Sequence, residues 1–306
     1  MTNQRKLLFL VNAHAGKEAI RSHFLRIVDT FVRAGYEPTV YISQRAGEMP
    51  AVAAREAEKY DLVVCSGGDG TLNETVDGLM RLEHPPVLGY IPAGTTNDFA
   101  TSLGIPKNME KAARTAVDGL AVHVDVGRLN ERHFAYVAAF GAFTDVAYAT
   151  PQDAKNILGK LAYLVEGAQR LTSLQTYHLH LEYDGGETDG EFLVGLVSNS
   201  SYVAGLPVGK LVDASMNDGL MEVNLVRRPP LMIELTRVIS RLLTGELDPE
   251  LVVSVKTRRL RVTSREPIPW TVDGEYGGRY TDAVIENLPR ALCINVPWGQ
   301  VKPKRK

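Results

Sequence analysis

The chain has 306 residues, of which 44% are hydrophobic, and its formal net charge is −2. This length allows two domains, and the composition is typical of a globular protein. A charge so near zero gives no overall attraction to nucleic acid, so we expect no nucleic-acid partner and only local basic patches. The apolar run ending at Val11 is too short for a signal peptide or a membrane span, which predicts a cytoplasmic protein. Cys65 and Cys293 lie in apolar runs, as reduced, buried thiols do.

Strand and helix patterns alternate through the first part of the chain. Apolar runs predict strands at 7–11, 39–43, 61–65 and 87–91. Apolar residues at helical spacing predict helices between them, the first ended by Gly35 and the second with Pro50 in its first turn. Another helix is expected near 108–117. Such alternation predicts a parallel sheet that binds ligands at the carboxyl ends of its strands.

A glycine-rich turn, SGGDGTLNE at 66–74, directly follows the third predicted strand. Its glycines allow close approach to a ligand, and the Thr71–Glu74 spacing is that of a capping box at a helix start. Amides at a helix start favour a phosphate, although an ordinary strand-to-helix turn explains the pattern equally well. Asp69 would repel a phosphate, so it either needs a divalent cation or orients backbone amides.

Two more loops leave the same predicted sheet edge. One spans 12–16, and the other, PAGTTND at 92–98, carries Thr95, Asn97 and Asp98. A helix cap is the alternative explanation for the second loop. Because three loops from three strand ends can meet at one ligand, their convergence favours a nucleotide site.

The second part of the chain has a β pattern. Strands are predicted at 177–183, 192–198, 220–226, 251–256, 260–263 and 270–272, with one helix over 157–168, which indicates a mainly antiparallel domain. His178 and His180 share a strand face, as metal ligands can, but a solvated polar face is the better explanation without a third ligand.

Two acidic turns in this part could carry chemistry. At 213–219 (DASMNDG), turn carbonyls with Asp218 would suit Mg²⁺, although a simple Asp-Gly turn explains most of the pattern. At 272–278 (VDGEYGG), glycines surround Asp273 and Glu275, and Glu275 could accept a proton from a hydroxyl. A β-turn with solvated acids is the alternative there.

Taken together, these motifs resemble the bacterial diacylglycerol kinase and related soluble lipid kinases. The matching motifs are GGDGT at 67–71, PxGTxND at 92–98, VDxG at 124–127, NDG at 217–219 and DGE at 273–275. The resemblance implies an ATP-dependent lipid kinase, with phosphoryl transfer to a lipid alcohol such as diacylglycerol. It implies a Rossmann-like parallel α/β nucleotide domain at 1–127 and a mainly antiparallel β-sandwich substrate domain at 128–288. The segment 289–306, with a basic tail, could return to the first domain.

The same resemblance implies roles for individual residues. The expected nucleotide-binding residues are Asn12, Ala13, His14, Ala15, Gly16, Ser43, Gly67, Gly68, Asp69, Gly70, Thr71, Leu72, Asn73 and Thr95. Glu275 matches the general base, and the expected acidic members of the site are Asp69, Asp98 and Asp125. Besides the Mg²⁺ bound with ATP, a structural Mg²⁺ would be held by Asp218 and the carbonyls of Ser215 and Leu220. The first loop departs from the family pattern because Ala13 stands where a proline is usual, which should loosen it.

Two alternatives remain: an enzyme like NAD kinase, which shares the glycine turn, and a non-catalytic nucleotide sensor. A lipid kinase must also reach its substrate, so we expect transient peripheral contact with the inner face of the cell membrane. Two basic clusters could supply it, although a solvated strand face and a frayed terminus explain them too. These clusters are Lys256, Arg258, Arg259 and Arg261, and Lys302, Lys304, Arg305 and Lys306. A homodimer is compatible with the sequence.

Overall fold

The computed structural model describes residues 4–12, 20–141, 175–200, 202–203, 206–207, 216–229 and 249–299. The chain divides into two compact units. The first contains residues 1–125 and 290–306, and the second contains residues 126–289. The helix predicted over 157–168 lies outside the described residues.

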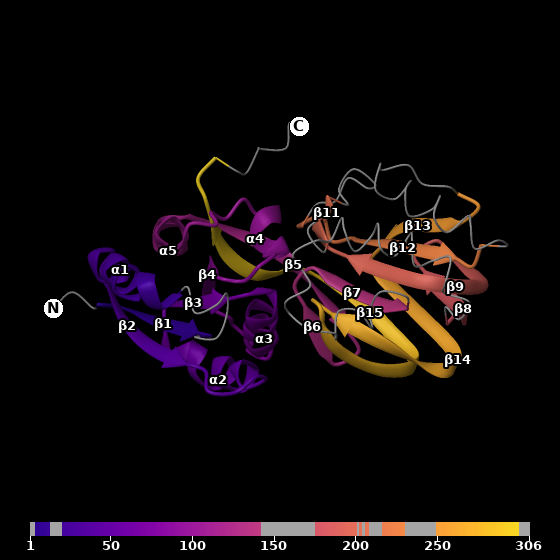
Figure 1. The fold of residues 1–306 in the computed structure, drawn as a ribbon, viewed down its shortest axis with the longest axis horizontal. Coiled ribbons are helices and arrows are strands. Elements are labelled where there is room, and N and C mark those ends of the chain that lie inside the picture. Colours follow the sequence, from indigo (N-terminus) through magenta and orange to yellow (C-terminus); the bar gives the residue numbers. More distant parts are fainter. Residues whose placement is uncertain are drawn as a thin grey trace. The chain divides into compact units, whose positions relative to one another are not determined.

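A sheet with the strand order β15-β4-β3-β1-β2 forms the centre of the first unit. Its neighbouring strands pair in parallel, and β15 joins through Ile294 beside Leu88. Figure 1 shows the yellow end of β15 beside β4. The strands are β1 (Arg5–Val11), β2 (Tyr36–Ile42), β3 (Leu62–Gly67), β4 (Val87–Pro92) and the end of β15 (Glu275–Val296).

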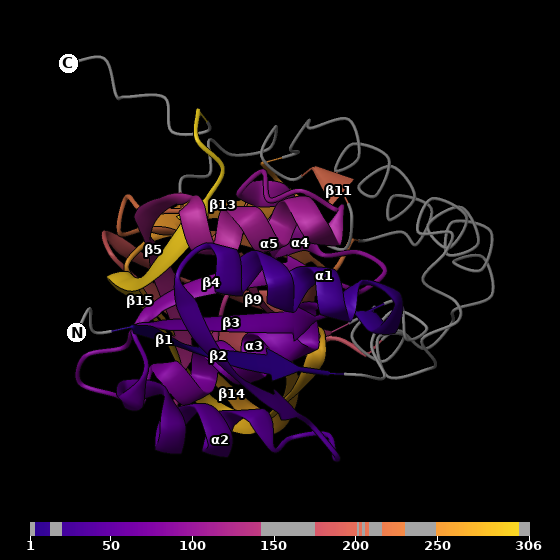
Figure 2. The ribbon, with the colours of Figure 1, turned by 90° about the vertical axis from the view of Figure 1, so that its left-hand side faces the viewer.

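Helices cover both faces of this sheet. Helix α1 packs beside α5, and α2 packs beside α3. The two pairs lie on opposite sides of the sheet in Figures 1 and 2. On the first side, Arg26 and His23 both contact the carboxylate of Glu110, at 2.9 and 3.2 Å. The helices are α1 (Ile20–Arg33), α2 (Met49–Glu56) followed by the 3-10 turn η2 (Ala57–Lys59), α3 (Asp69–Leu79), α4 (Asp98–Ser102) and α5 (Met109–Asp118).

The carboxyl ends of β1, β3 and β4 lie side by side. Ser66 of β3 is level with Val11 of β1 and with Ile91 of β4. Just beyond, Asn12 N donates to Ser66 O at 2.9 Å, and Ala93 N donates to Gly67 O at 2.8 Å. The loops that begin at Asn12, Gly68 and Ala93 therefore start at one edge of the sheet.

The second unit is rich in antiparallel β-structure. Its main strand order is β13-β12-β9-β7-β14-β15. Strands β7 and β8 follow one another between β9 and β14, because each pairs with both of these long strands. The strands are β5 (Leu120–Leu129), β6 (Arg132–Phe134), β7 (Val137–Gly141), β8 (Tyr177–Tyr183), β9 (Gly186–Ser198), β12 (Met221–Arg227), β13 (Val252–Thr257) and β14 (Arg259–Val272), with a separate pair of β10 (Tyr202–Val203) and β11 (Leu206–Pro207).

Aromatic side chains fill the core of this unit. The Phe140 ring lies 4.9 Å from Trp270 and 5.9 Å from Tyr177, centroid to centroid, in edge-on contacts that suit aromatic quadrupoles. The two short strands predicted at 260–263 and 270–272 are one strand, β14, whose register with β15 shifts between Thr263 and Ile268. Such a bulge interrupts the alternating pattern without ending the strand.

A carboxyl group is buried at the start of β12. The Glu222 side chain is 2% exposed and pairs with Lys256 of β13 at 3.3 Å. Burial raises the pKa of Glu222 from its usual 4.5 to about 7; Lys256 opposes this rise, and Asp218 adds to it. The folded state therefore binds an extra proton between these two pH values, and its stability falls as the pH rises through this range.

Replacing Glu222 with Gln should remove this pH dependence. We expect the free energy of unfolding of the native chain, relative to Glu222→Gln, to fall by about 1 to 3 kcal/mol between about pH 4.5 and about pH 7.5. Urea melts of both proteins across this range measure the difference. The control is Glu187→Gln, which changes an exposed glutamate on β9. Equal pH dependence for the native chain and Glu222→Gln would contradict the expectation.

Candidate active site

The glycine turn lies between β3 and α3. Gly68 is the N-cap residue, with an extended backbone, and α3 begins at Asp69. A side chain is excluded at Gly67, because a Cβ there would lie 2.3 Å from the hydroxyl oxygen of Thr71. The first amides of α3 thus stand at the edge where the three loops begin, with the positive end of the helix dipole behind them. Such an arrangement binds anions.

The capping box predicted for Thr71 and Glu74 is wrong. The N-cap residue is Gly68, which has no side chain, and Thr71 lies inside the helix, which begins three residues earlier than this spacing requires. Each side chain has another role: the Thr71 hydroxyl accepts a bond from Asn12 Nδ2 at 3.0 Å, and Glu74 Oε1 accepts one from Gly47 N at 2.9 Å. Thr71 therefore links the glycine turn to the first loop.

The loop after β4 folds around Asn97. This residue has a positive φ of 54°, and its amide accepts a bond from Gly94 N at 3.0 Å and donates one to Gly94 O at 2.8 Å. Gly94 passes directly against the glycine turn, since a Cβ on it would lie 2.6 Å from Gly68 Cα. Thr95, at the outer end of this loop, is exposed. Two loops from neighbouring strands thus meet backbone to backbone.

Two predicted carboxylates meet at this junction. Asp98 is 2% exposed, and its backbone amide donates to Asp69 Oδ2 at 3.3 Å. Asp69 therefore does orient a backbone amide. Carboxylate oxygens beside an anion-binding helix start are suitable ligands for a divalent cation that also binds phosphate. Among the described residues no group of three or more His, Cys, Asp and Glu could hold a metal, so this pair would be only part of a coordination shell.

A pocket of about 480 Å³ opens near the ends of β1 and β2. Ser43, a predicted nucleotide contact, lies in it; it is 6% exposed, and its amide donates to Val11 O at 2.9 Å. Its apolar wall comes from Ile20, Phe24 and Ile42. No sequence signal identified these three residues, because helix and strand periodicity explains them as core. Of the first loop, Asn12 is described, whereas Ala13, His14, Ala15 and Gly16 lie outside the described residues.

Asp125 is completely buried in β5, at the point where this strand leaves the first unit. Its Oδ1 accepts a bond from the backbone amide of Arg290 at 2.7 Å, and Arg290 has a positive φ of 54°. A buried carboxyl oxygen that accepts a backbone amide can hold such an unfavourable conformation in place. The carboxylate thus fixes the point where the chain returns to the first unit.

Asp273 and Glu275 lie on a tight hairpin between β14 and β15. Asp273 and Gly274 both have positive φ, 48° and 85°, and Val272 faces Glu275, which is the two-residue turn that Asp-Gly favours. The Asp273 carboxylate accepts three bonds at once, from the amides of Ala135, Tyr136 and Val137 at 2.6, 3.0 and 2.9 Å. Asp273 is 3% exposed, whereas Glu275 is exposed. The buried Asp273 carboxylate and its three amide donors thus form a clamp, which fixes the turn that carries the exposed Glu275.

The predicted Mg²⁺ site at 213–219 is only partly described. Asp218 Oδ1 accepts a bond from Leu220 N at 3.1 Å, and Gly219 between them has a φ of 79°. This hydrogen bond and positive φ are those of a simple Asp-Gly turn, which was the alternative explanation for the pattern. Ser215 lies outside the described residues, so the predicted ligand set of Ser215, Asp218 and Leu220 stays a prediction.

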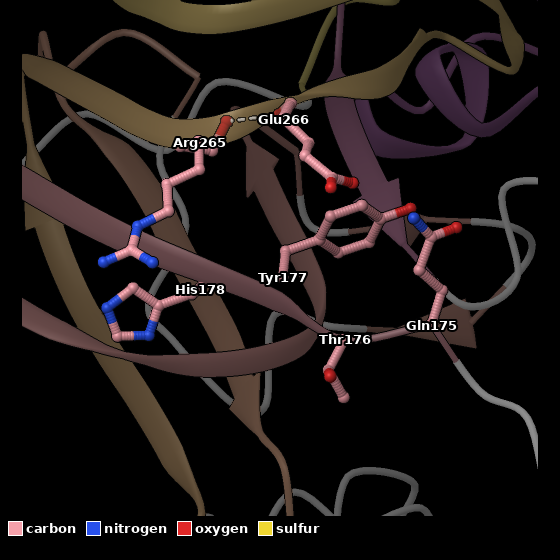
Figure 3. A pocket seen from close by; sticks show the side chains of 7 residues that line it. Gln175, Thr176, Tyr177, His178, Arg265 and Glu266 are labelled. Atoms are coloured by element: carbon pink, nitrogen blue, oxygen red, sulfur yellow. Dashed lines mark hydrogen bonds between the residues drawn. The ribbon is translucent and has the colours of Figure 1, made fainter.

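A second pocket, of about 240 Å³, lies between the start of β8 and the middle of β14, where the register of β14 shifts (Figure 3). His178 and Arg265 stand beside one another there, with Tyr177 and Glu266 in the same wall. His180 faces other partners, Asp189 at 3.1 Å and Glu182 at 3.5 Å, and its pKa is raised by the Asp189 hydrogen bond. No predicted nucleotide, catalytic or metal residue lines this pocket.

Comparison with known proteins identifies the family. Residues 6–129 match the diacylglycerol kinase catalytic domain, and residues 137–296 match the YegS C-terminal NAD kinase beta sandwich-like domain. The diacylglycerol kinase of Bacillus subtilis (strain 168) is 35% identical, over 96% of this chain and 97% of its own. That of Staphylococcus carnosus (strain TM300) is 34% identical, over 96% of both. A crystal structure assigned to a diacylglycerol kinase of Bacillus anthracis (strain Sterne) superimposes with a TM-score of 0.82 at 25% identity, covering 98% of this chain and 100% of that chain.

This fold and these motifs are those of a kinase with a nucleotide-binding first domain and a β-rich second one. The chain belongs to the diacylglycerol kinase family, as the resemblance of its motifs predicted. It is therefore a lipid kinase, a phosphotransferase with ATP as co-substrate and a divalent cation. No helix in the described ranges is long and apolar enough to cross a membrane.

The clamp at Asp273 should be essential for the hairpin that carries Glu275. Asp273→Ala leaves three buried amides unsatisfied, so we expect the free energy of unfolding to fall by about 3 to 5 kcal/mol, measured by urea denaturation. Asp282→Ala is the matched control, because it removes an aspartate from an exposed ion pair with Arg261. It should cost less than about 1 kcal/mol. Similar losses for the two variants would show that the clamp is not special.

Proposed function

We propose that this chain is an ATP-dependent diacylglycerol kinase, which transfers the γ-phosphate to the free hydroxyl of diacylglycerol and forms phosphatidic acid. The observation that carries the proposal is 35% identity, over 96% of the chain, to a protein named diacylglycerol kinase. We further infer that the α/β part, 1–127, is a Rossmann-like nucleotide domain. The β part, 128–288, is a sandwich-type domain that selects the lipid, and the segment 289–306 completes the first domain.

The nucleotide lies along the edge where the three loops of the first unit begin. Backbone amides from Gly67 to Thr71 hold the phosphates, and Asn12, which bonds to Thr71, borders them. The pocket at Ser43 takes the base against its apolar wall, where Ile20 offers aliphatic contact and Phe24 an aromatic ring. Asn73 and Leu72 are buried in the first turns of α3, and they hold the amides of this phosphate cradle, Gly67 to Thr71, in a fixed position. The first loop, 13–16, and Thr95 complete the set.

Mg²⁺ is the cation that suits this donor set, since Asp69 and Asp98 offer hard carboxylate oxygens next to the phosphate cradle. When bound, it supplies positive charge that offsets the repulsion between these carboxylates and the phosphates. We assign a second, structural Mg²⁺ to Asp218 with the carbonyls of Ser215 and Leu220. The buried Asp125 supports the first unit from behind rather than touching substrate.

Glu275 is the general base. Its carboxylate accepts the proton of the lipid hydroxyl while that oxygen forms its bond to the γ-phosphorus. The bond from the γ-phosphorus to the bridging oxygen breaks, and its electron pair leaves with ADP. Glu275 suits this role because it is exposed on a turn whose conformation the Asp273 clamp fixes. A fixed base loses less entropy when the acceptor arrives.

Glu275→Gln should abolish turnover and leave nucleotide binding intact. Glutamine has the same shape but does not take the proton, so we expect kcat to fall by a factor of about 10² to 10⁴. The assay uses Mg·ATP with diacylglycerol in mixed micelles, and calorimetry measures nucleotide affinity. Glu182→Gln, an exposed glutamate on β8, is the control. Near-normal phosphorylation by Glu275→Gln would remove Glu275 from the mechanism.

The acceptor distinguishes this proposal from its alternatives. The same assay with NAD in place of the lipid tests an NAD kinase activity, and a panel of glycerol-based and sphingoid alcohols defines the lipid class. Phosphorylation of NAD alone would replace the proposal by the NAD kinase alternative. Nucleotide binding without ATP consumption in the presence of any acceptor would favour a sensor.

Membrane contact through the basic cluster at 256–261 has little support. Three of its four cations pair with carboxylates: Lys256 with Glu222 at 3.3 Å, Arg259 with Glu286 at 3.4 Å and Arg261 with Asp282 at 2.8 Å. These three carboxylates offset most of the positive charge that would attract the cluster to an anionic surface.

The C-terminal cluster is the better candidate for peripheral contact at the inner face of the cell membrane. Trp298 lies four residues before Lys302 and is 71% exposed, with its ring nitrogen held by Asp118 O at 2.7 Å. Tryptophan next to basic residues is typical of segments that bind at a membrane interface.

Removing these groups should weaken binding to vesicles that contain anionic phospholipid. We expect Trp298→Ala to weaken it, and neutralising Lys302, Lys304, Arg305 and Lys306 with Gln to cost about 1 kcal/mol per residue near the surface. Co-sedimentation with vesicles of stated anionic content measures both. The controls are Leu25→Ala, which removes an 81% exposed leucine, and Arg261→Gln. Binding that does not depend on the anionic lipid content would contradict the electrostatic part.

A further inference from the structure

Tyr90 lies beneath the junction of the glycine turn and the loop after β4. It is level with Cys65 in the pairing of β3 with β4 and is 1% exposed. Its hydroxyl oxygen is 3.1 Å from Gly67 O and 3.3 Å from Asn97 Oδ1. The first partner belongs to the end of β3, where the glycine turn begins, and the second belongs to the loop that contains Gly94. One side chain therefore contacts both walls of the candidate phosphate site.

Both partners of this hydroxyl are acceptors. Gly67 O is a carbonyl oxygen, and the Asn97 amide is oriented by its two bonds to Gly94, which leave Oδ1 as the atom that faces Tyr90. The Tyr90 hydroxyl is thus the donor to both, sharing one hydrogen between them. A shared donor favours a short separation of the two acceptors, because it can bond to both only while they stay close together.

We propose that Tyr90 is a nucleotide-positioning residue, which sets the spacing between the glycine turn and the loop of Gly94 and Asn97. This inference rests on the proposed function, since it requires the two loops to hold the phosphates of one nucleotide. Tyr90 does not touch the nucleotide. It acts through Asn97 and Gly67, and so through the close contact of Gly94 with Gly68.

The hydroxyl is not required for folding. Gly67 O also accepts a bond from Ala93 N at 2.8 Å, and Asn97 Oδ1 also accepts one from Gly94 N at 3.0 Å. Phenylalanine at position 90 would fill the same volume and leave neither oxygen without a donor. Removing the Tyr90 hydroxyl should therefore loosen the spacing of the two loops without leaving a buried polar group unsatisfied.

The hydroxyl keeps its proton at every working pH. Burial raises the pKa of Tyr90 well above its usual 10.0, and the negative charges of Asp69 and Asp98 add to this rise. Tyr90 thus remains a donor, and it has no part in proton transfer. Its removal should change nucleotide affinity without changing the shape of the pH profile of kcat.

The test compares Tyr90→Phe with Tyr36→Phe. Tyr36 is 7% exposed, at the opposite, amino-terminal end of the same sheet and beneath the Arg5 guanidinium. Calorimetry with Mg²⁺ and a non-hydrolysable ATP analogue measures nucleotide Kd. We expect Tyr90→Phe to weaken binding about three- to tenfold, as for one buried hydrogen bond, and Tyr36→Phe to leave it unchanged. In the kinase assay the KM for ATP should rise and the KM for the lipid should not.

A second variant shows whether Tyr90 acts through Asn97. Asn97→Gly keeps the positive φ and removes the amide side chain. In that background Tyr90→Phe should weaken nucleotide binding by less than twofold, because the shared partner is already gone. Tyr90→Phe with native nucleotide affinity, in a wild-type background that binds the analogue, would overturn the positioning role alone. A wild-type protein that binds no nucleotide would overturn both this inference and the proposed function.

Discussion

The contact between Gly68 and Gly94 is the constraint on which the first unit's site depends. A methyl group on Gly94 would lie 2.6 Å from Gly68 Cα, so the loop after β4 can pass the glycine turn this closely only if residue 94 has no side chain. That closeness brings the start of α3, the Asn97 turn and the carboxylates of Asp69 and Asp98 to one edge. Backbone amides cost little to preorganise once the chain is folded, and they bind phosphate through geometry rather than through a flexible side chain.

In the second unit, a single carboxylate, that of Asp273, fixes the hairpin between β14 and β15. Asp273 is an acid in a glycine-rich motif, and from sequence it looks as accessible as Glu275. The structure separates them: one side chain is buried beneath three amides, and the other is exposed on the turn that those bonds fix. The two acids, two residues apart, thus differ in burial and in surroundings: Asp273 is bonded inside the fold, and Glu275 is exposed.

Local patterns predicted the strands and helices of the first unit and the edge where its loops meet, because these follow from periodicity and from the direction of parallel strands. The errors lie where the exact starting residue of a helix matters. Helix α3 begins at Asp69, so Thr71 and Glu74 bond to Asn12 and Gly47 instead of capping it. Tyr90 carried no signal, since an aromatic residue inside a strand is expected in a core. In the second unit, glycines and a register shift hid the length of β14 and β15.

Strand β15 belongs to both units, and this has a consequence for synthesis. Its first part pairs with β14, and its last residues complete the first unit through Ile294 beside Leu88, Asn295 bonded to Ala116 O and Arg290 held by Asp125. A ribosome releases residues 1–125 long before it makes residues 290–296. The nucleotide-binding unit must therefore wait, with one sheet edge open, until the rest of the chain has emerged. The unit that is synthesised first is therefore the last to complete its sheet.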